Sequence, residues 1–550
     1  MTDEPEEDLL RPVDRAFAAA MLRRSGATGE LLSEVLARAC WAPSAGHLCA
    51  ELTVPECDAV RAAPSALVRA PGRPGRTPLV LQGNSLYLDR CWIVETTIVD
   101  AVRARASQAT SMSAATAAGL VDQVFTDDPR QASGRAAVQV ALTRRLAVIT
   151  GGPGTGKTTV VRMFLECLQR SGARPQVALA APTGKAADRL AQQVQGVDLP
   201  QTRGTLHGLL GVIDVDKGIF RHGPSNPIAA DVVVLDEASM VDAAMMARLL
   251  SAVWPETQVV LLGDPDQLRS VDYGSVLGDI CRAASHEPLA SATARLTHVW
   301  RTDGEGIQAL SQAIREQDAD AALLALETYP DVNLVEPATR GAGGLETLLR
   351  ARVEAVWGDL ATLPPELGLA RLRKLRILCA HRHGPRGVST VNELAHAWLV
   401  DAGKIARRGL WYEGRPLMIR RNDRAMDLRN GNVGLIRDGE AWFDLEGLRS
   451  LPPSLLPEHE TVYASTVHKA QGSEAEEIIV LLPHEDSPLL TRELLYTAVT
   501  RAIQNVTIVG SPDVVRAAID TSSPRMSGVE RRLRTTRGDD RLKGAGGQNS

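Results

Sequence analysis

The stretch Gly-Gly-Pro-Gly-Thr-Gly-Lys-Thr at 151–158 carries the clearest chemistry in the chain, because it fits the pattern of a phosphate-binding loop. Its glycines let backbone N–H groups approach phosphates, Lys157 can pair with β and γ oxygens, and Thr158 can offer its hydroxyl to Mg²⁺. A glycine-rich turn without a ligand is the alternative. An apolar run at 146–150 and a helical run at 159–169 favour the loop, because its mechanism requires a strand before it and a helix after it.

Two adjacent carboxylates, Asp236 and Glu237, follow the apolar run 232–235, which is typical of a buried strand. Asp236 can hold Mg²⁺ through water, and Glu237 can activate an attacking water molecule. A solvated acidic turn is the alternative, and the position of the pair downstream of the loop disfavours it. Gln267, after a strand predicted at 258–262, could contact a γ-phosphate. Together these residues predict a nucleoside triphosphatase.

Parallel strands must position these residues, and the sequence provides two sets of them. Short apolar strands alternate with helices from 146 to 262, and a second set has strands at 376–380, 478–482 and 506–509. This alternation predicts an α/β protein with two parallel sheets in series. Residues 411–462 are rich in short strands and turns, which predicts a small β insertion in the second domain.

The domain boundaries follow from shifts in composition. The first 110 residues contain apolar helical stretches and no catalytic motif, which favours a docking domain. The last residues are rich in arginine, glycine and serine, which favours disorder. We therefore expect a docking domain at 1–110, motor domains at 111–293 and 294–521, an insertion at about 408–462, and a disordered basic tail at 522–550.

Composition limits the class of protein. No apolar run reaches about 18 residues, and the N-terminal segment is acidic, so we expect a cytoplasmic protein. Seven cysteines without a CxxC pair argue against a disulfide framework, and the spacings of Cys40, Cys49 and Cys57 fit no compact zinc knuckle. The net charge of −5 means that nucleic-acid binding requires a local groove rather than a basic body.

Arg501, in the second α/β domain, could reach across a cleft to the nucleotide, and Arg301 is a second candidate. An arginine from another lobe stabilises transition-state charge only when the lobes close, which couples hydrolysis to movement. A surface salt bridge is the alternative for either residue.

The motifs, in their order, resemble the RecD branch of superfamily-one helicases. They are GGPGTGKTT (151–159), APTGKAADRL (181–190), TLH (205–207), VVVLDEASMVD (232–242), LLGDPDQLRSV (261–271), TVHKAQGSE (466–474) and LLYTAVTRA (494–502). The resemblance covers about 130–510. Within that range, 376–392 and 414–434 are similar to RecD segments in particular, and so are two segments of the first hundred residues, 46–52 and 86–95. It implies two RecA-like P-loop NTPase domains in series, a helical N-terminal docking domain and an SH3-like β insertion.

The resemblance also implies roles for single residues. Catalytic roles fall on Lys157, Asp236, Glu237, Gln267, Arg301 and Arg501, and Mg²⁺ binding on Thr158 and Asp236. ATP binding falls on Gly151, Gly152, Pro153, Gly154, Thr155, Gly156, Lys157, Thr158, Thr159, Gly472 and Glu474. Contacts with single-stranded DNA fall on Thr183, Thr205, His207, Thr466 and His468.

The sequence departs from the family pattern at one position. The family places an adenine-reading glutamine seventeen residues before the first loop glycine, where this chain has Gly134, and Gln131 is the candidate substitute. Residues 211–227 predict a hairpin, which is either the element that splits the duplex in this family or an ordinary surface hairpin.

The resemblance implies an ATP-driven 5′→3′ DNA helicase, acting as a motor subunit with RecB-like and RecC-like partners at double-strand breaks. A free-standing RecD-like helicase is the first alternative, although only about 130 residues precede the motor, where such helicases carry a long extension. A catalytically idle docking subunit is the second, and the intact motifs oppose it. No persuasive carboxylate set for a nuclease occurs, so we expect nuclease activity in a partner.

Overall fold

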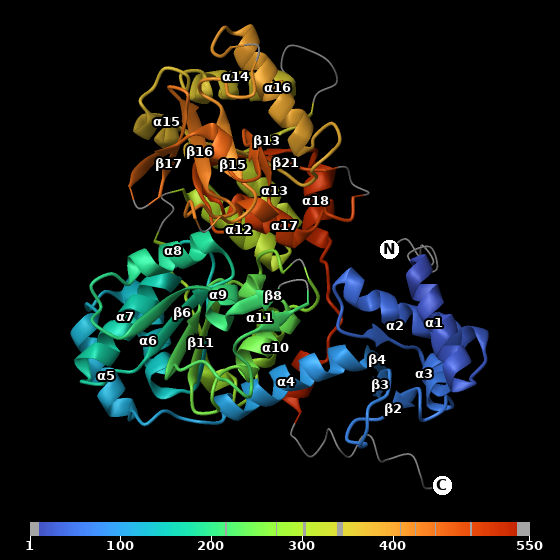
Figure 1. Ribbon diagram of the computed structural model, residues 1–550. Helices are drawn as coiled ribbons and strands as arrows, with labels where there is room; N and C mark the ends of the chain where they lie inside the picture. Colours follow the sequence, from blue (N-terminus) through green and yellow to red (C-terminus); the bar gives the residue numbers. More distant parts are fainter. Residues whose placement is uncertain are drawn as a thin grey trace.

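The computed structural model describes most of the chain, and two stacked lobes with a smaller domain at their side make up the molecule (Figure 1). The described residues are 10–214, 217–270, 272–300, 304–337, 345–406, 409–423, 425–445, 447–483 and 487–535. Within these ranges, no helix combines the length and the apolar character needed to cross a membrane.

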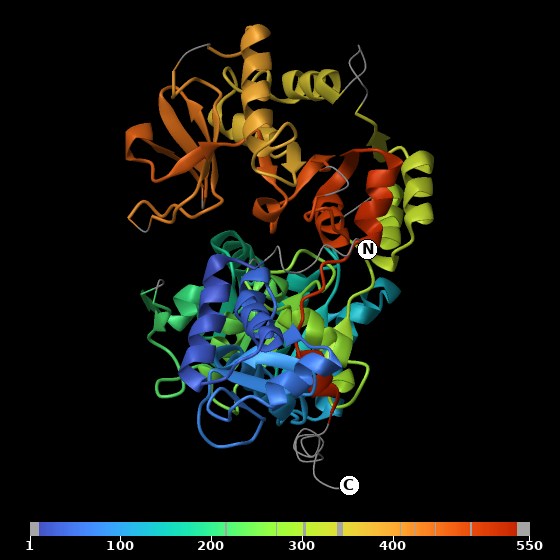
Figure 2. The ribbon, with the colours of Figure 1, turned by 90° about the vertical axis from the view of Figure 1, so that its right-hand side faces the viewer.

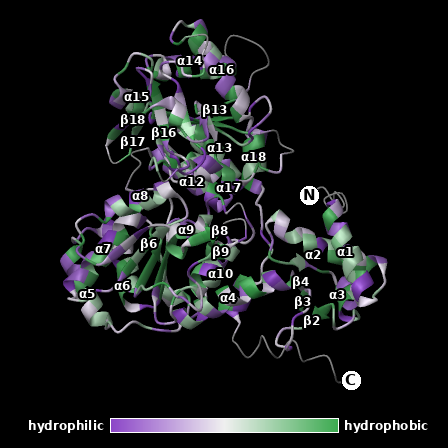
Figure 3. Ribbon diagram, viewed as in Figure 1, coloured by the Kyte–Doolittle hydropathy of each residue, from purple (hydrophilic) through white to green (hydrophobic). Residues whose placement is uncertain are grey.

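The first lobe is built on six parallel strands in the order β12-β5-β11-β10-β6-β7. They are β5 (Leu146–Thr150), β6 (Val177–Ala181), β7 (Gln201–Thr205), β10 (Val232–Leu235), β11 (Gln258–Gly263) and β12 (Thr293–Arg295). The central strands are continuous apolar runs buried on both faces, as a parallel sheet between helices requires (Figure 3). The covering helices are α5 (Ala114–Val124), α6 (Ala132–Thr143), α7 (Lys157–Arg170), α8 (Gly184–Gln193), α9 (Leu206–Leu210), α10 (Ala243–Ser251) and α11 (Val276–Ala283).

The second lobe repeats the plan with five parallel strands in the order β13-β22-β21-β14-β20. They are β13 (Val332–Val335), β14 (Leu375–Cys379), β20 (Ala464–Thr466), β21 (Ala475–Leu481) and β22 (Ala502–Val509). Its helices are α12 (Glu305–Glu316), α13 (Ala319–Thr328), α14 (Leu345–Trp357), α15 (Pro365–Leu372), α16 (Val388–Asp401), α17 (Arg492–Val499) and α18 (Pro512–Asp520). The predicted pair of α/β domains is confirmed.

A five-stranded antiparallel sheet interrupts the second lobe, at the place where the sequence predicts a β insertion. Its strands are β15 (Pro416–Ile419), β16 (Val433–Arg437), β17 (Glu440–Asp444), β18 (Leu448–Leu451) and β19 (His459–Thr461). Leu417, Ile436 and Phe443 form its small apolar core. Figure 2 shows the insertion projecting to one side of the second lobe.

The N-terminal domain contains more than the helices that the sequence predicts. Helices α1 (Pro12–Ser25), α2 (Glu30–Trp41) and α3 (Val54–Arg61) pack with a four-stranded sheet, β1-β4-β3-β2. The strands are β1 (Ala50–Glu51), β2 (Val68–Arg69), β3 (Leu79–Gln82) and β4 (Ser85–Leu88). The long helix α4 (Asp89–Ala106) runs from this sheet along α10 of the first lobe (Figure 1). One continuous apolar core therefore joins the domain to that lobe.

The prediction of a disordered tail from residue 522 is wrong for 522–535. This segment returns from the second lobe to the N-terminal domain and ends in α19 (Val529–Arg534), which packs on α4 and α11 (Figure 1). Glu95 is fully buried there, and it accepts hydrogen bonds from Gly528 N at 2.8 Å and from Arg532 Nη1 at 3.2 Å. A buried carboxylate needs such partners, and they order the segment. Residues 536–550 lie outside the described residues.

Candidate active site

The phosphate-binding loop joins β5 to α7, as the sequence predicts. Gly156 has a φ of +84° and caps the N-terminus of α7, and Lys157 is the first residue of that helix. The Lys157 ammonium donates to the carbonyl oxygens of Gly151 at 2.6 Å and Gly152 at 3.0 Å. A Cβ atom on Gly151 would lie 2.6 Å from Thr155 Oγ1, so the turn has room only for glycine. The loop N–H groups and the helix dipole therefore make a positive site for phosphates.

Asp236 and Glu237 follow β10 directly. Asp236 is fully buried; its Oδ1 accepts the Glu237 N–H at 2.8 Å, while Oδ2 is buried without a hydrogen-bond partner among the described residues. Burial, followed by the charge of Glu237, raises the pKa of Asp236. Burial acts on Glu237 in the same sense, but Arg189 and Lys157 outweigh it and lower the pKa of Glu237. The carboxylate of Glu237 is thus kept ionised.

Arg189, on α8, connects the two lobes at this site. Its Nη2 donates to Glu237 Oε1 at 3.0 Å, and its Nη1 lies 3.7 Å from Oε1 of Glu474 in the second lobe. The sequence analysis did not select Arg189. Its position in the motif at 181–190 could have identified it as a site residue. It lies one helical turn after Lys185, so both residues share a face of α8.

Polar contacts also join the loop that contains Gln267 to the second lobe. Gln267 Nε2 donates to Asp264 Oδ2 at 3.0 Å, and the Tyr496 hydroxyl donates to the same oxygen at 3.2 Å. Leu268 N donates to Thr497 Oγ1 at 2.7 Å. Gln267 therefore sits where a change in the nucleotide can be transmitted between the lobes.

The predicted ATP-site residues meet around a cavity of about 250 Å³ between the lobes. The site residues predicted from the sequence that line this cavity are Pro153, Gly154, Thr155, Gly156, Lys157, Thr158, Thr159, Glu237, Gln267, Glu474 and Arg501. Arg501 is only 2% exposed, and its Nε donates to Thr497 O at 3.2 Å. Gly151, Gly152 and Asp236 do not line the cavity, Gly472 lines a neighbouring one, and Arg301 lies outside the described residues.

Trp300 is a lining residue that the sequence analysis missed. Its backbone N–H donates to Gly154 O at 2.9 Å, and 46% of the residue is exposed. A Cβ atom on Gly156 would lie 3.5 Å from the indole, so the ring stands beside the phosphate loop. Arg130 lies 5.3 Å from the ring centroid. An exposed aromatic face at this position is suited to stacking on a nucleobase.

Neither candidate for reading adenine lines the cavity. Gly134 lies in α6, where a Cβ atom would meet Phe125 at 3.3 Å and Val160 at 3.7 Å. The Gln131 side chain accepts the Thr126 N–H at 3.3 Å instead. Gly134 therefore packs closely against Phe125 and takes no part in the nucleotide cavity.

The predicted DNA-contact residues follow the carboxyl ends of parallel strands, where such sheets bind ligands. Thr183 follows β6, Thr205 ends β7 and Thr466 ends β20. In the first lobe the carboxyl ends face the nucleotide cavity, whereas in the second lobe the segments that precede β21 and β22 face it. His207 lies in α9, with its ring 6.2 Å from that of Phe220.

The fifth predicted DNA contact, His468, lies in the short turn of helix that follows Thr466. Burial, and to a smaller extent Arg525, lowers the pKa of His468. The imidazole is therefore neutral near pH 7 and would contact DNA by hydrogen bonding rather than by charge.

A hairpin is present where the sequence predicts one, with β8 (Val212–Asp214) antiparallel to β9 (Ile219–Phe220). Ile213 is 66% exposed, and Arg248 lies 4.4 Å from the centroid of the Phe220 ring. The hairpin therefore stands on the surface with an apolar side chain directed outward.

Five of the seven cysteines are buried, and Cys40 and Cys281 are half-buried. Cys57 lies in the large core shared with the first lobe, whereas Cys49 packs with Tyr87 and Trp92. Burial raises the pKa of Cys49 to about 12. Among the described residues, no three His, Cys, Asp or Glu side chains are grouped to hold a metal ion.

Comparisons with known proteins cover most of the chain. Residues 129–337 match the AAA domain model, and 461–509 match the UvrD-like helicase C-terminal domain. The RecBCD enzyme subunit RecD of Mycolicibacterium smegmatis is 40% identical over 84% of this chain and 84% of its own length. The ATP-dependent RecD2 DNA helicase of Deinococcus radiodurans is 34% identical over 65% of this chain and 46% of its own. The crystal structure of Pif1 helicase from Bacteroides with ADP-AlF3 and ssDNA gives a TM-score of 0.39 at 17% identity, over 68% of this chain and 91% of that one.

Proposed function

Because this chain belongs to the RecD family of RecBCD enzyme subunits, we propose that it is the 5′→3′ DNA motor of a RecBCD-type complex. It is an ATP-dependent DNA helicase, and its substrate in this proposal is a single strand at a duplex end. One observation carries the proposal: the phosphate loop and Glu237 of one lobe share a cavity with Arg501 of the other. Nucleotide turnover can therefore open and close the space between the lobes.

ATP is the proposed nucleotide substrate, and Thr158 and Asp236 are proposed to hold Mg²⁺. The buried, unpartnered Oδ2 of Asp236 supports this assignment, because a water ligand of the ion would satisfy it. Thr158 lines the cavity beside Lys157. Mg²⁺, when bound, offsets charge on the β- and γ-phosphates.

Three residues of this chain have separate roles in the proposed hydrolysis. Lys157 exchanges the carbonyl oxygens of Gly151 and Gly152 for phosphate oxygens. Glu237, kept ionised by Arg189 and Lys157, orients water and accepts its proton. Arg501 stabilises the charge of the transferring phosphoryl group from the second lobe.

The single strand is proposed to bind across both lobes, at the residues that follow β6 and β7 in the first lobe and β20 in the second. Thr183, Thr205 and His207 would contact it from the first lobe, and Thr466 and His468 from the second. The hairpin β8–β9 would meet the duplex with Ile213 and separate its strands. Contacts from both lobes let a change in their separation move the strand.

The N-terminal domain is proposed to bind RecB-like and RecC-like subunits, which carry the nuclease activity. Four large apolar side chains on its helices are exposed: Val54 by 75%, Val13 by 59%, Ile93 by 43% and Leu31 by 39%. Exposed apolar groups of this kind are typical of protein interfaces. We also propose that the complex is cytoplasmic, in line with the location predicted from the sequence.

Copurification tests the assembly. The tagged chain, isolated from its native host, should bring two large subunits with it, and Val54→Asp with Ile93→Asp should release them. The same double variant should still hydrolyse ATP with single-stranded DNA, because neither residue lies at the nucleotide cavity. A chain that is recovered alone and unwinds DNA would instead identify a free-standing helicase. A chain that binds partners but hydrolyses no ATP would identify an idle docking subunit.

A further inference from the structure

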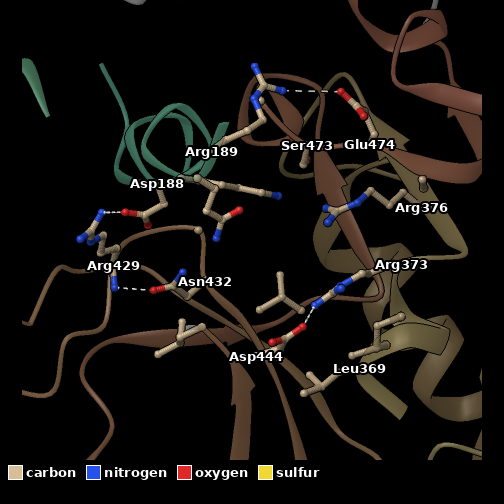
Figure 4. Close-up of a pocket in the computed structure, with 18 of the residues that line it drawn as sticks. Asp188, Arg189, Leu369, Arg373, Arg376, Arg429, Asn432, Asp444, Ser473 and Glu474 are labelled. Atoms are coloured by element: carbon tan, nitrogen blue, oxygen red, sulfur yellow. Dashed lines mark hydrogen bonds and ion pairs between the residues drawn. The ribbon is translucent and has the colours of Figure 1, made fainter. Parts of the chain in front are cut away.

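A second cavity, of about 530 Å³, lies beside the nucleotide cavity. Arg189 and Glu474 line both, so this ion pair stands between them. Helix α8 bounds the second cavity from the first lobe, α15 and 472–476 bound it from the second, and the insertion loop 427–433 closes it (Figure 4). The cavity is therefore assembled only when the two lobes and the β insertion meet.

Basic and acidic side chains alternate around this cavity, and most of the acids are already held by a basic neighbour. The pairs are Arg429 with Asp188, Arg373 with Asp444, Arg189 with Glu474, and Lys374 with Glu476. Figure 4 shows the first three around the cavity. The remaining lining acid, Asp427, is exposed.

Two basic residues that line the cavity, Lys185 and Arg376, belong to none of these ion pairs. Neither side chain has a hydrogen bond or ion pair with another residue in the described ranges, and Arg376 Nε is buried without a partner. Burial, and then the charge of Arg376, lowers the pKa of Lys185 to about 7. Two neighbouring cations are costly in a partly buried site, because Glu474 offsets the charge of Lys185 only in part, and an anion between them would lower that cost.

We propose that this cavity binds a phosphate-class oxyanion between Lys185 and Arg376, and that inorganic phosphate leaving the nucleotide cavity is its source. The tetrahedral, doubly charged product of ATP hydrolysis matches two cations that present N–H donors. Separation of Arg189 from Glu474, which are 3.7 Å apart, would open the way from one cavity to the other. The source named here rests on the proposed ATPase function.

Equilibrium dialysis with labelled inorganic phosphate tests the site directly, with a non-hydrolysable ATP analogue and Mg²⁺ occupying the phosphate loop. The wild-type chain should bind one phosphate, and Lys185→Gln and Arg376→Gln should each weaken binding roughly tenfold, as loss of a charge-assisted hydrogen bond does. Lys404→Gln is the control, because this exposed lysine of the second lobe does not line the cavity and should leave binding unchanged. Lys157→Gln, measured without nucleotide, should also keep the site.

Thermal unfolding separates binding from a structural role. At one phosphate concentration, with the ATP analogue and Mg²⁺ present, phosphate should raise the Tm of the wild-type chain more than that of Lys185→Gln, because stabilisation by a ligand depends on its affinity. Without phosphate, both variants should match or exceed the wild-type Tm, since each removes a buried positive charge that its neighbours do not fully offset. A variant that is less stable without phosphate would indicate a structural cation and overturn the proposal.

Two further outcomes would contradict it. Phosphate affinity that is the same in the wild type and in Lys185→Gln would show that the cavity is not the site. A loss of affinity for a single-stranded oligonucleotide, with phosphate binding intact, would assign the two cations to the DNA backbone instead. Failure of the wild-type chain to hydrolyse ATP would remove the proposed source, whereas the dialysis result judges the site independently.

Discussion

Arg189 Nη2 lies 3.0 Å from Glu237 Oε1, so the proposed catalytic base is bound to a cation of its own lobe. Burial acts to raise the pKa of Glu237, and Arg189 is the largest influence that lowers it. A base works in its ionised form, so Arg189→Gln should let the pKa rise and move the acid limb of the kcat profile to higher pH. ATPase measurements across the acid range check this.

The control for that profile is Arg162→Gln on α7, which breaks a surface pair with Glu166, and neither residue lines the nucleotide cavity. Its acid limb should coincide with that of the wild type. An unshifted limb in Arg189→Gln would show that this arginine does not set the ionisation of Glu237.

Arg501 is predicted to act on the transition state from the second lobe. Arg501→Gln should lower kcat by on the order of a thousandfold and leave nucleotide affinity within about threefold. Glutamine is preferred to alanine because Arg501 is buried and a cavity would confuse the result. Turnover and binding of a fluorescent ATP analogue should be measured together, and a parallel loss of both would indicate a binding or structural role.

Trp300 is predicted to stack on the nucleobase. Trp300→Ala should raise the KM for ATP about tenfold with little change in kcat, because stacking on an aromatic ring contributes roughly 1–3 kcal/mol. Trp254→Ala is the matched control, since this tryptophan is 54% exposed and lines no part of the nucleotide cavity. If KM is unchanged while kcat falls, the indole has another role.

Arg532 is predicted to hold the C-terminal segment on the N-terminal domain. Its guanidinium lies 3.2 Å from the buried Glu95 and 4.3 Å from the Trp92 ring centroid. Arg532→Met should destabilise this region by about 3 kcal/mol, because it leaves a buried carboxylate without its cation. Denaturant unfolding should show it, whereas Arg531→Met, at the exposed neighbour, should stay near the wild type. Equal stability of both variants would contradict this role.

The sequence predicted the parts of the fold that have local signals. Continuous apolar runs identified β5 and β10, and glycine spacing identified the loop before α7, because both depend on neighbouring residues. Glu237 and Arg501 could be assigned to one site because their motifs are short and fixed in form.

Contacts between distant segments had no such signal. Arg532 and Glu95 are 437 residues apart, and the composition around Arg532 favours disorder until Glu95 is placed beside it. Trp300 and Arg189 likewise join the site through the folding of the first lobe, which brings them to Gly154 and Glu237. From the sequence alone, we expect a chain that lacks residues 1–105 to remain a working motor. The structure contradicts this expectation, because the deletion would remove almost all of α4 from the core of the first lobe. Surface substitutions such as Val54→Asp are therefore the better test of docking.

Strand separation from defined overhangs tests the central claim most directly. At one fixed salt concentration, the wild-type chain should unwind a duplex with a 5′ single-stranded overhang when ATP and Mg²⁺ are present, and Lys157→Gln should not, although it stays folded. Lys157 contacts the loop only through the Gly151 and Gly152 carbonyls, so its loss should affect phosphates rather than the fold. Preference for a 3′ overhang, or equal unwinding by Lys157→Gln, would contradict the account.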